Sequence, residues 1–168
     1  MVRILCLVSL FFFWSCKSTT YYIVRHAEKE QGTTMLSDPP LSAEGEKQAM
    51  DLKEFLRNKS IKAVYSTNYA RTIATAEPIR KLFNLTLKIY DPRKTDQLVD
   101  ELKKKSEGNV LVVGHSNTVD DIVNGLTGEN KMTDLAENEY GNVFIVKKKG
   151  SSYSFERMKV PQATHTSP

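Results

Sequence analysis

Two short apolar runs, each followed by a histidine, most constrain how this chain can fold. Residues 21–24 read Tyr-Tyr-Ile-Val and lead into Arg25 and His26, and residues 110–113 read Val-Leu-Val-Val and lead through a glycine into His115. Short apolar runs rich in β-branched residues are typical of strands buried on both faces of a parallel sheet. Because ligands bind at the carboxyl ends of such strands, the sequence predicts that the two histidines belong to one site.

Segments with helical spacing separate the strand-like segments along most of the chain. The expected strands are 21–25, 61–66, 85–90, 109–114, 142–147 and 153–159, and the expected helices are 42–58, 68–83, 95–105 and 117–126. Pro78 is expected to break or kink the second helix. Alternation of this kind indicates parallel strands joined by right-handed crossovers. We therefore predict an α/β fold, a three-layer αβα sandwich with a mostly parallel central sheet and an antiparallel edge hairpin at the C-terminus.

The first sixteen residues have the pattern of an export signal. Arg3 precedes an apolar stretch over residues 4–14, which at eleven residues is shorter than the roughly 20 that a helix needs to cross a bilayer. This pattern sets the expected boundaries: a signal peptide over 1–16, a linker over 17–20, a single domain over 21–160 and a frayed tail over 161–168.

Cys16, preceded by the small residue Ser15, resembles the lipobox of bacterial lipoproteins. The resemblance implies a lipid anchor on Cys16 and a place in the bacterial cell envelope, periplasmic or membrane-anchored. Phe13 and Trp14 depart from the usual pattern, so ordinary cleavage or retention as a short anchor also remain open. The only other cysteine is Cys6 within the signal, so the mature domain would hold no disulfide.

The net charge of +4 implies little about partners by itself. The densest basic runs are residues 103–105 and 147–149, each three lysines, and we interpret them as the solvated ends of a helix and a strand. No aromatic residues alternate with these lysines as a single-strand binder would need, so no nucleic-acid partner is expected.

Three further segments extend the pattern that begins with Arg25 and His26. They are residues 41–49 (Leu-Ser-Ala-Glu-Gly-Glu-Lys-Gln-Ala), residues 65–72 with Thr75-Ala76 following, and residues 113–117 (Val-Gly-His-Ser-Asn). In this order and at these spacings they resemble the histidine phosphatase superfamily, which includes cofactor-dependent phosphoglycerate mutases and short phosphohistidine phosphatases. The resemblance spans about residues 21–128, and the chain has the size of the short phosphohistidine phosphatases.

The chemistry of phosphoryl transfer agrees with these residue types. It needs an aligned nucleophile and positive charge around the phosphoryl oxygens, and an imidazole can form a covalent phosphoryl intermediate. Guanidinium groups offer paired donors to such oxygens. The resemblance implies that His26 is the nucleophile and that Arg25, Arg71 and His115 complete the phosphate pocket.

Two more expectations concern the surroundings of this pocket. Ser66 and Asn117 are expected to contact substrate, and the helices that open near residues 68–72 and 116–117 would aim N–H groups at an anion. The histidines lack a metal-ligand spacing and the arginines supply positive charge, so we expect no metal and no cofactor.

The identity of the proton donor stays open between several carboxylates. The resemblance implies a donor from the segment after the third strand, residues 90–96, where aspartates stand in place of the mutases' glutamate. Asp91 is the first candidate, although Asp91 as a turn former before Pro92 and Asp96 as a helix cap are equally open. Glu28, two residues past the nucleophile, is the second candidate or a supporting residue.

Together these observations predict a phosphomonoesterase that works through a phosphohistidine on His26, with a carboxylic acid protonating the leaving group. The expected substrate is a phosphorylated small molecule or a phosphoprotein. The alternatives are a phosphoglycerate mutase-like phosphotransferase, which the short connections disfavour, and a non-catalytic, lipid-anchored protein that binds phosphate or a phosphorylated ligand. A metal site that includes His26, His115 and Glu28 is a further rival.

Overall fold

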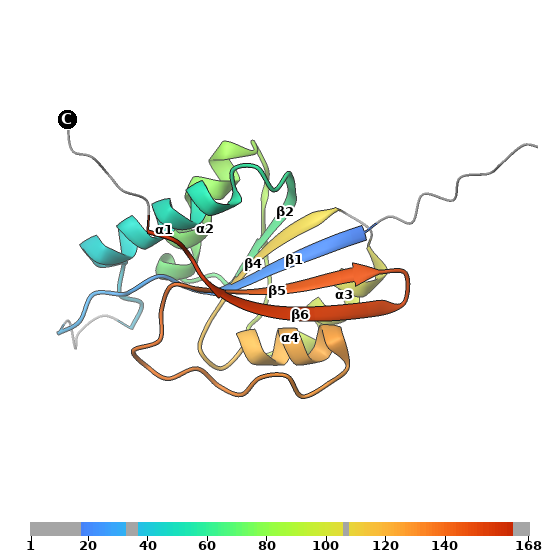
Figure 1. Cartoon of the computed structure of the whole chain (residues 1–168). Helices are drawn as coiled ribbons and strands as arrows, with labels where there is room; N and C mark the ends of the chain where they lie inside the picture. The colour runs from blue at the N-terminus through green and yellow to red at the C-terminus, as the bar shows by residue number, and fades with distance from the viewer. Residues whose placement is uncertain (1–17, 33–36, 106–107, 163–168) are drawn as a thin grey trace, which may run out of the picture.

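Six strands in one sheet and four helices make up the computed structural model of the chain, which describes residues 18–32, 37–105 and 108–162 (Figure 1). The strands are β1 (Ser18–Arg25), β2 (Ile61–Ser66), β3 (Leu87–Ile89), β4 (Asn109–Gly114), β5 (Asn142–Lys149) and β6 (Ser152–Lys159). The helices are α1 (Ala43–Leu56), α2 (Ala70–Leu82), α3 (Thr95–Lys104) and α4 (Val119–Thr127).

The sheet is mixed, with the strand order β3-β2-β4-β1-β5-β6. Strands β1 to β4 pair in parallel, whereas β5 runs antiparallel to β1 on one side and to β6 on the other. The mostly parallel sheet and the C-terminal edge hairpin are therefore confirmed. In the centre of the sheet Arg25 lies opposite Gly114, so β1 and β4 end at the same level.

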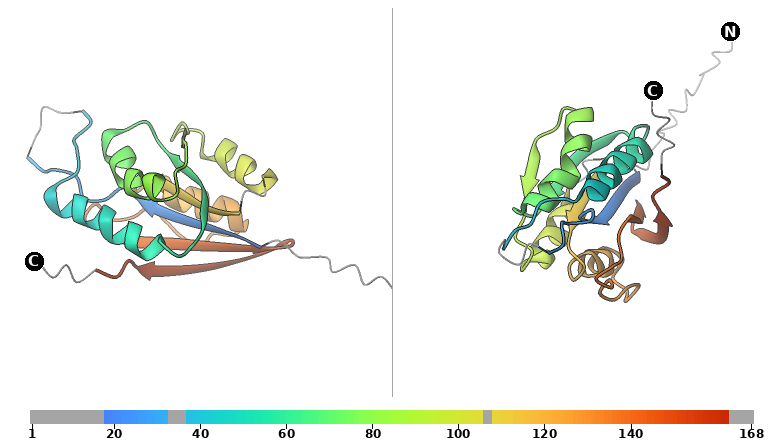
Figure 2. Two further views of the ribbon diagram at one scale, coloured as in Figure 1. Left: turned by 90° about the horizontal axis from the view of Figure 1, so that it is seen from above. Right: turned by 90° about the vertical axis from the view of Figure 1, so that its left-hand side faces the viewer.

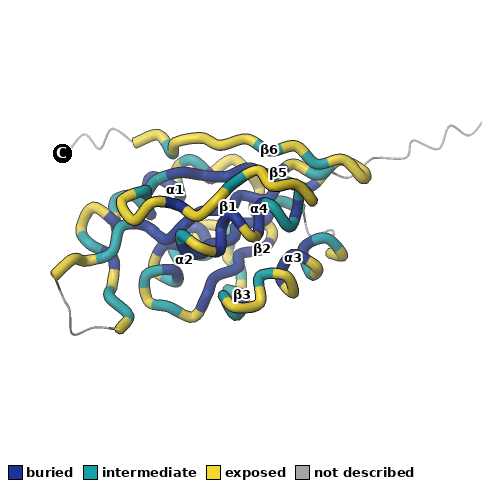
Figure 3. The backbone as a smooth tube through the Cα atoms, turned by 90° about the horizontal axis from the view of Figure 1, so that it is seen from below, coloured by how far each residue is buried: buried dark blue, intermediate teal, exposed yellow. Residues whose placement is uncertain are grey.

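Helices cover both faces of the sheet, as the two views of Figure 2 show. Alternate residues of β1 point to opposite faces: Tyr21 and Ile23 belong to the core under α3 and α4, and Tyr22 and Val24 to the core under α1 and α2. This is why the sequence of β1 is apolar at successive positions. Figure 3 shows the consequence, a buried set of central strands beside an exposed edge strand β6.

Several boundaries differ from the expected ones by a few residues, and three features of the chain are instructive. β1 begins at Ser18, since residues 18–20 of the expected linker pair with residues 147–149 of β5. β3 begins at Leu87, because Asn84 adopts φ 50° and Leu85 donates its N–H to the carbonyl of Arg80, which extends the end of α2. Pro78 does not break α2, which continues to Leu82.

The N-terminal expectations fall on residues that the structure does not describe. The signal peptide over 1–16, its Cys16 and most of the expected tail lie outside the described residues. Within the described ranges, no helix is long and apolar enough to cross a membrane.

The two-sided core predicts that two positions one turn apart on α2, Ile79 and Leu82, contribute very differently to the free energy of unfolding. Ile79 is fully buried and Leu82 is 46% exposed. We expect Ile79→Ala to lower the free energy of unfolding by about 2–5 kcal/mol, because it leaves a cavity beneath the sheet. Leu82→Ala, the matched control, should cost less than about 1 kcal/mol. Urea unfolding followed by circular dichroism measures both, and equal losses would contradict this packing.

Candidate active site

A pocket of about 310 Å³ opens where the parallel strands end, beyond the carboxyl ends of β1, β2, β3 and β4. Both histidines and both arginines singled out from the sequence line it. The lining comprises Arg25, His26, Lys29, Tyr69, Arg71, Pro92, Arg93, His115, Ser116, Asn117, Thr118 and Glu137. Cationic side chains outnumber the one carboxylate among these residues, as a site for an anion requires.

His26 is held by its backbone and by one ring nitrogen, which leaves the other nitrogen available. Its backbone N–H donates to the carbonyl of Gly114 at 2.9 Å, and its Nδ1 lies 2.8 Å from the carbonyl oxygen of Ala27. Because a carbonyl only accepts hydrogen bonds, Nδ1 must carry the proton. The lone pair of the neutral imidazole is therefore on Nε2, the atom that can act as a nucleophile.

Two of the sequence motifs fasten the segment that follows His26. The backbone N–H of Ala27 donates to Thr75 Oγ1 at 2.9 Å, and that of Glu28 donates to Gln48 Oε1 at 3.0 Å. Gly45 lies so close to this segment that an added Cβ would collide with the carbonyl oxygen of Glu28. The motifs around Gly45 and Thr75 thus position the nucleophile from outside the pocket.

His115 lies beside His26, with ring centroids 5.5 Å apart and the rings at 66°. Its Nε2 is 2.9 Å from Thr67 Oγ1, and its Nδ1 is 3.5 Å from an Arg71 nitrogen, Nη2. Thr67 therefore fixes the orientation of the second imidazole, so that its other nitrogen faces the arginine.

Arg71 stands in the first turn of α2 and binds a carboxylate already. Its Nη1 lies 3.0 Å from Asp38 Oδ1, and the other oxygen of Asp38 accepts the Ala70 N–H at 2.7 Å. The expected donation of this N–H group to a ligand anion is thus replaced by an internal carboxylate. The guanidinium carbon lies 4.6 Å from the centre of the Tyr69 ring, an arrangement that orients the side chain.

Arg25 is held by the connection between α4 and β5. Its Nη1 donates to the carbonyls of Ala136 and Glu137 at 2.8 and 3.0 Å, and its guanidinium carbon lies 4.3 Å from the centre of the Tyr140 ring. Within the part of the chain that the structure describes, the Nε atoms of Arg25 and Arg71 are buried without a hydrogen-bond partner. A buried N–H donor without a partner is costly, so both atoms favour an acceptor.

Both imidazoles are neutral near pH 7. Burial lowers the pKa of His26 to about 3, with Arg25 and Arg71 acting in the same direction and the hydrogen bond to the Ala27 carbonyl opposing them. Burial, followed by the charges of Arg71 and Arg25, lowers the pKa of His115 to about 4. A neutral His26 is the form that can attack phosphorus.

The structure does not bring Glu28, Asp91 or Ser66 to the pocket lining. Glu28 accepts a hydrogen bond from Ser42 Oγ at 2.8 Å, at the start of α1. Asp91 binds the backbone and guanidinium of Arg93, the geometry of a turn former, and these hydrogen bonds lower its pKa to about 2. Ser66 is fully buried and donates to the carbonyl of Thr67 at 2.9 Å.

Several site residues were missed in the sequence. Thr67 and Tyr69 lie within the motif over residues 65–72, so their place beside Arg71 could have suggested a contact with the site. Lys29 and Glu137 carried no comparable signal. Glu137 in particular lies between Gly128 and Gly141 in a stretch without regular secondary structure, where no periodicity predicts direction.

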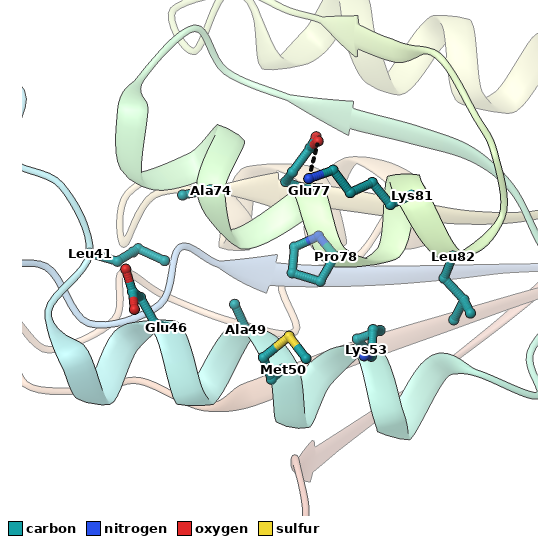
Figure 4. Close-up of a pocket in the computed structure, with 10 residues that line it drawn as sticks. All are labelled: Leu41, Glu46, Ala49, Met50, Lys53, Ala74, Glu77, Pro78, Lys81 and Leu82. Atoms are coloured by element: carbon teal, nitrogen blue, oxygen red, sulfur yellow. Dashed lines mark ion pairs between the residues drawn. The ribbon is translucent and has the colours of Figure 1, made fainter.

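A larger groove of about 700 Å³ lies elsewhere, between α1 and α2 (Figure 4). Its lining is mainly aliphatic, with Met50 and Leu82 among its exposed side chains and an ion pair of 3.4 Å between Glu77 and Lys81. It contains neither histidine, and its two lysines are matched by two glutamates. The smaller cationic pocket is therefore the candidate active site.

The described residues also bear on the rival metal site. Within those ranges, no three His, Cys, Asp or Glu side chains come together in a group that could hold a metal ion. Glu28 in particular is bound to Ser42, away from the pocket lining.

Comparison with known proteins finds a family whose sequence pattern part of this chain matches. Residues 21–93 match the model of the histidine phosphatase superfamily, branch 1. The chain is 35% identical over 95 residues to the probable phosphoglycerate mutase GpmB of Salmonella choleraesuis (strain SC-B67), an alignment that covers 48% of this chain and 44% of that protein. The chain thus spans about half the length of the curated relatives it matches.

Solved structures share the fold at low sequence identity. The protein histidine phosphatase SixA, complexed with tungstate, aligns with a TM-score of 0.68 and 18% identity, covering 84% of this chain and 97% of that one. Phosphoglycerate mutase from Bacillus anthracis aligns with a TM-score of 0.61 and 20% identity, covering 85% and 93%.

The sheet and its pocket define an α/β protein with two neutral imidazoles and two arginines gathered at the ends of parallel strands. The family match and the relatives confirm the resemblance that the motifs indicate. Residues 21–93 match the histidine phosphatase superfamily, branch 1, and the fold of the described chain is similar to that of the protein histidine phosphatase SixA.

The lowered pKa values predict how the two histidines titrate. An ordinary histidine takes up a proton near pH 6.5, whereas His26 and His115 should stay neutral until well below pH 5, because burial and the arginines disfavour the cation. Nitrogen NMR of the imidazoles between pH 8 and 4, with H26Q and H115Q used for assignment, measures this. A midpoint near 6.5 for either ring would refute the burial that the structure describes.

Proposed function

We propose that the chain is a phosphomonoesterase that works through a covalent phosphohistidine on His26. The observation that supports this most is the state of the His26 ring: Nδ1 is fixed on the Ala27 carbonyl, so that Nε2 carries the lone pair in a cationic pocket. A nucleophile with one nitrogen oriented by a third group is the arrangement expected of nucleophilic catalysis.

The reaction proceeds in two displacements. His26 Nε2 attacks phosphorus, the bond from phosphorus to the leaving oxygen breaks, and that oxygen takes up a proton. Water then attacks the phosphohistidine and the P–N bond breaks, so that the imidazole leaves in its neutral form. One proton of the water returns to the proton donor and the other stays on inorganic phosphate. The guanidinium groups of Arg25 and Arg71, which line the pocket, supply the donors that stabilise the charge on the equatorial oxygens.

Hydrolysis is favoured over a mutase reaction by the connections around the pocket. Those after β2, β3 and β4 are three to five residues long, and the longer ones precede α1 and β5. A mutase must shield its phosphoenzyme from water while an intermediate reorients, which needs covering segments. The proposed reaction needs no metal, because Arg25 and Arg71 supply the positive charge at the phosphoryl group.

The first prediction of this proposal concerns the nucleophile. Hydrolysis of p-nitrophenyl phosphate should fall by at least about 10³-fold in H26N, since no atom replaces Nε2. The wild-type rate should be unchanged by a chelator, and wild-type enzyme quenched and digested at alkaline pH, where the P–N bond is stable, should carry a phosphoryl group on His26 by mass spectrometry. Met50→Ala, in the groove between α1 and α2, is the control and should retain full activity. Full activity in H26N would overturn the mechanism.

The carboxylate best placed for proton transfer is Glu137. It is the only carboxylate in the pocket lining among the described residues, and its Oε2 lies 3.6 Å from Arg25 Nη2. Its side chain is 85% exposed, so it can reach a leaving group that enters from solvent. Asp91 and Glu28 are instead held by Arg93 and Ser42.

This assignment predicts a dependence on the leaving group. A leaving alkoxide needs a proton far more than a nitrophenolate does, so E137Q should slow kcat for glycerol 2-phosphate by about 100-fold and change p-nitrophenyl phosphate hydrolysis little. A rise in KM on both substrates would mean instead that Glu137 only orients Arg25. If D91N, and not E137Q, shows the selective loss, Asp91 is the proton donor.

A further inference from the structure

Two lysine runs that are far apart in the sequence come together at one end of the molecule. Lys103 and Lys104 end α3 and Lys105 follows them, and residues 147–149 end β5. The fold joins them directly, because Lys148 Nζ donates to the carbonyl of Lys103 at 3.0 Å. We call these six lysines the basic end.

The basic end is also where the described chain begins. Ser18, the first residue of β1, pairs with Lys149 of the neighbouring strand, and Thr19 pairs with Lys148. In Figure 1 the start of β1 and the turn between β5 and β6 lie together at the right-hand end. The apolar stretch over residues 4–14 and Cys16 therefore join the fold next to the six lysines.

The charge of this end is positive even after its ion pairs are counted. Among the described residues, three of the six lysines have a carboxylate within ion-pair distance: Lys104 with Asp100, Lys105 with Glu101 and Lys147 with Glu156. Six positive charges thus face three negative ones. Lys104 is 78% exposed and Lys147 57%, so their ammonium groups reach the surface.

The candidate active site lies at the opposite ends of the strands, beyond the carboxyl ends of β1 to β4. Arg25 is the last residue of the strand that Ser18 begins, and His26 follows it directly. Eight residues of extended chain place these two ends about 23 Å apart. The pocket residues that follow β2, β3 and β4 all lie at that far edge, since these strands run parallel to β1.

We propose that the basic end is a docking surface for an anionic lipid bilayer, held there by the N-terminal segment. One lipid chain or one short apolar segment binds a membrane weakly, and a basic cluster beside it supplies the second attraction. Docked in this way, the pocket faces the aqueous phase, away from the membrane. The substrate class that follows, given the proposed phosphatase activity, is a water-soluble phosphoryl compound or phosphoprotein rather than a headgroup of the same bilayer.

The test uses the full chain, extracted from bacterial membranes in detergent and reconstituted into two kinds of vesicle. One kind is phosphatidylcholine alone and the other contains one-third phosphatidylglycerol. Exposed amines are labelled with a membrane-impermeant reagent and mapped by peptide mass spectrometry. We expect the lysines of the basic end to be labelled several-fold less, relative to Lys94 beyond β3, in the anionic vesicles only.

A matched pair of variants separates charge from simple attachment. K147E/K149E should restore labelling of residues 103–105 in anionic vesicles, whereas K47E/K53E on α1, with the same change of net charge, should not. Equal labelling in the two kinds of vesicle, or recovery of the protein in the supernatant, overturns the proposal. Hydrolysis of p-nitrophenyl phosphate is measured on the same samples. Loss of lipid-dependent protection with intact hydrolysis rejects the docking surface alone, and protection without hydrolysis rejects the proposed function alone.

Discussion

The parallel pairing of β1 with β4 is the constraint on which the rest of the structure depends. Its register sets Arg25 opposite Gly114, so His26 and His115 leave the sheet side by side, and the His26 N–H continues the ladder to the Gly114 carbonyl. A shift of one residue would turn every buried side chain of β1 toward the wrong face. The positions at which the two imidazoles leave the sheet are therefore fixed by the packing of the core, and the contacts with Ala27 and Thr67 orient the rings.

Most of the fold could be predicted because its signals are local. Apolar runs without polar alternation indicated central strands, and the glycines and polar residues between segments marked the connections. The sequence-based prediction is wrong where contacts with another part of the fold determine the local structure. Residues 18–20 are polar or small and become strand only because β5 pairs with them. Pro78 removes one N–H donor from α2, yet the helix continues through it to Leu82.

The residues of the candidate site also fall into two groups, those that the sequence predicts and those that it does not. Arg25, His26, Arg71 and His115 could be predicted because strand ends and motif order bring them together. The orientation of each candidate carboxylate is set by its hydrogen-bond partner. The spacing of residues in the sequence does not indicate that Glu28 accepts a hydrogen bond from Ser42 or that Asp91 binds Arg93. Glu137 reaches the pocket from a connection without periodicity, so only the folded chain reveals it.

Asp38 gives the pocket a property that its list of cations does not suggest. Its carboxylate bridges Arg71 and the first N–H of α2, the two donors that an incoming phosphoryl group would use. An anion that binds at this position has to displace the carboxylate of Asp38 from Arg71 and from the Ala70 N–H. Under the proposed function, a dianionic phosphoryl group gains more than a monovalent anion from replacing this carboxylate, so Asp38 favours ligands of higher charge.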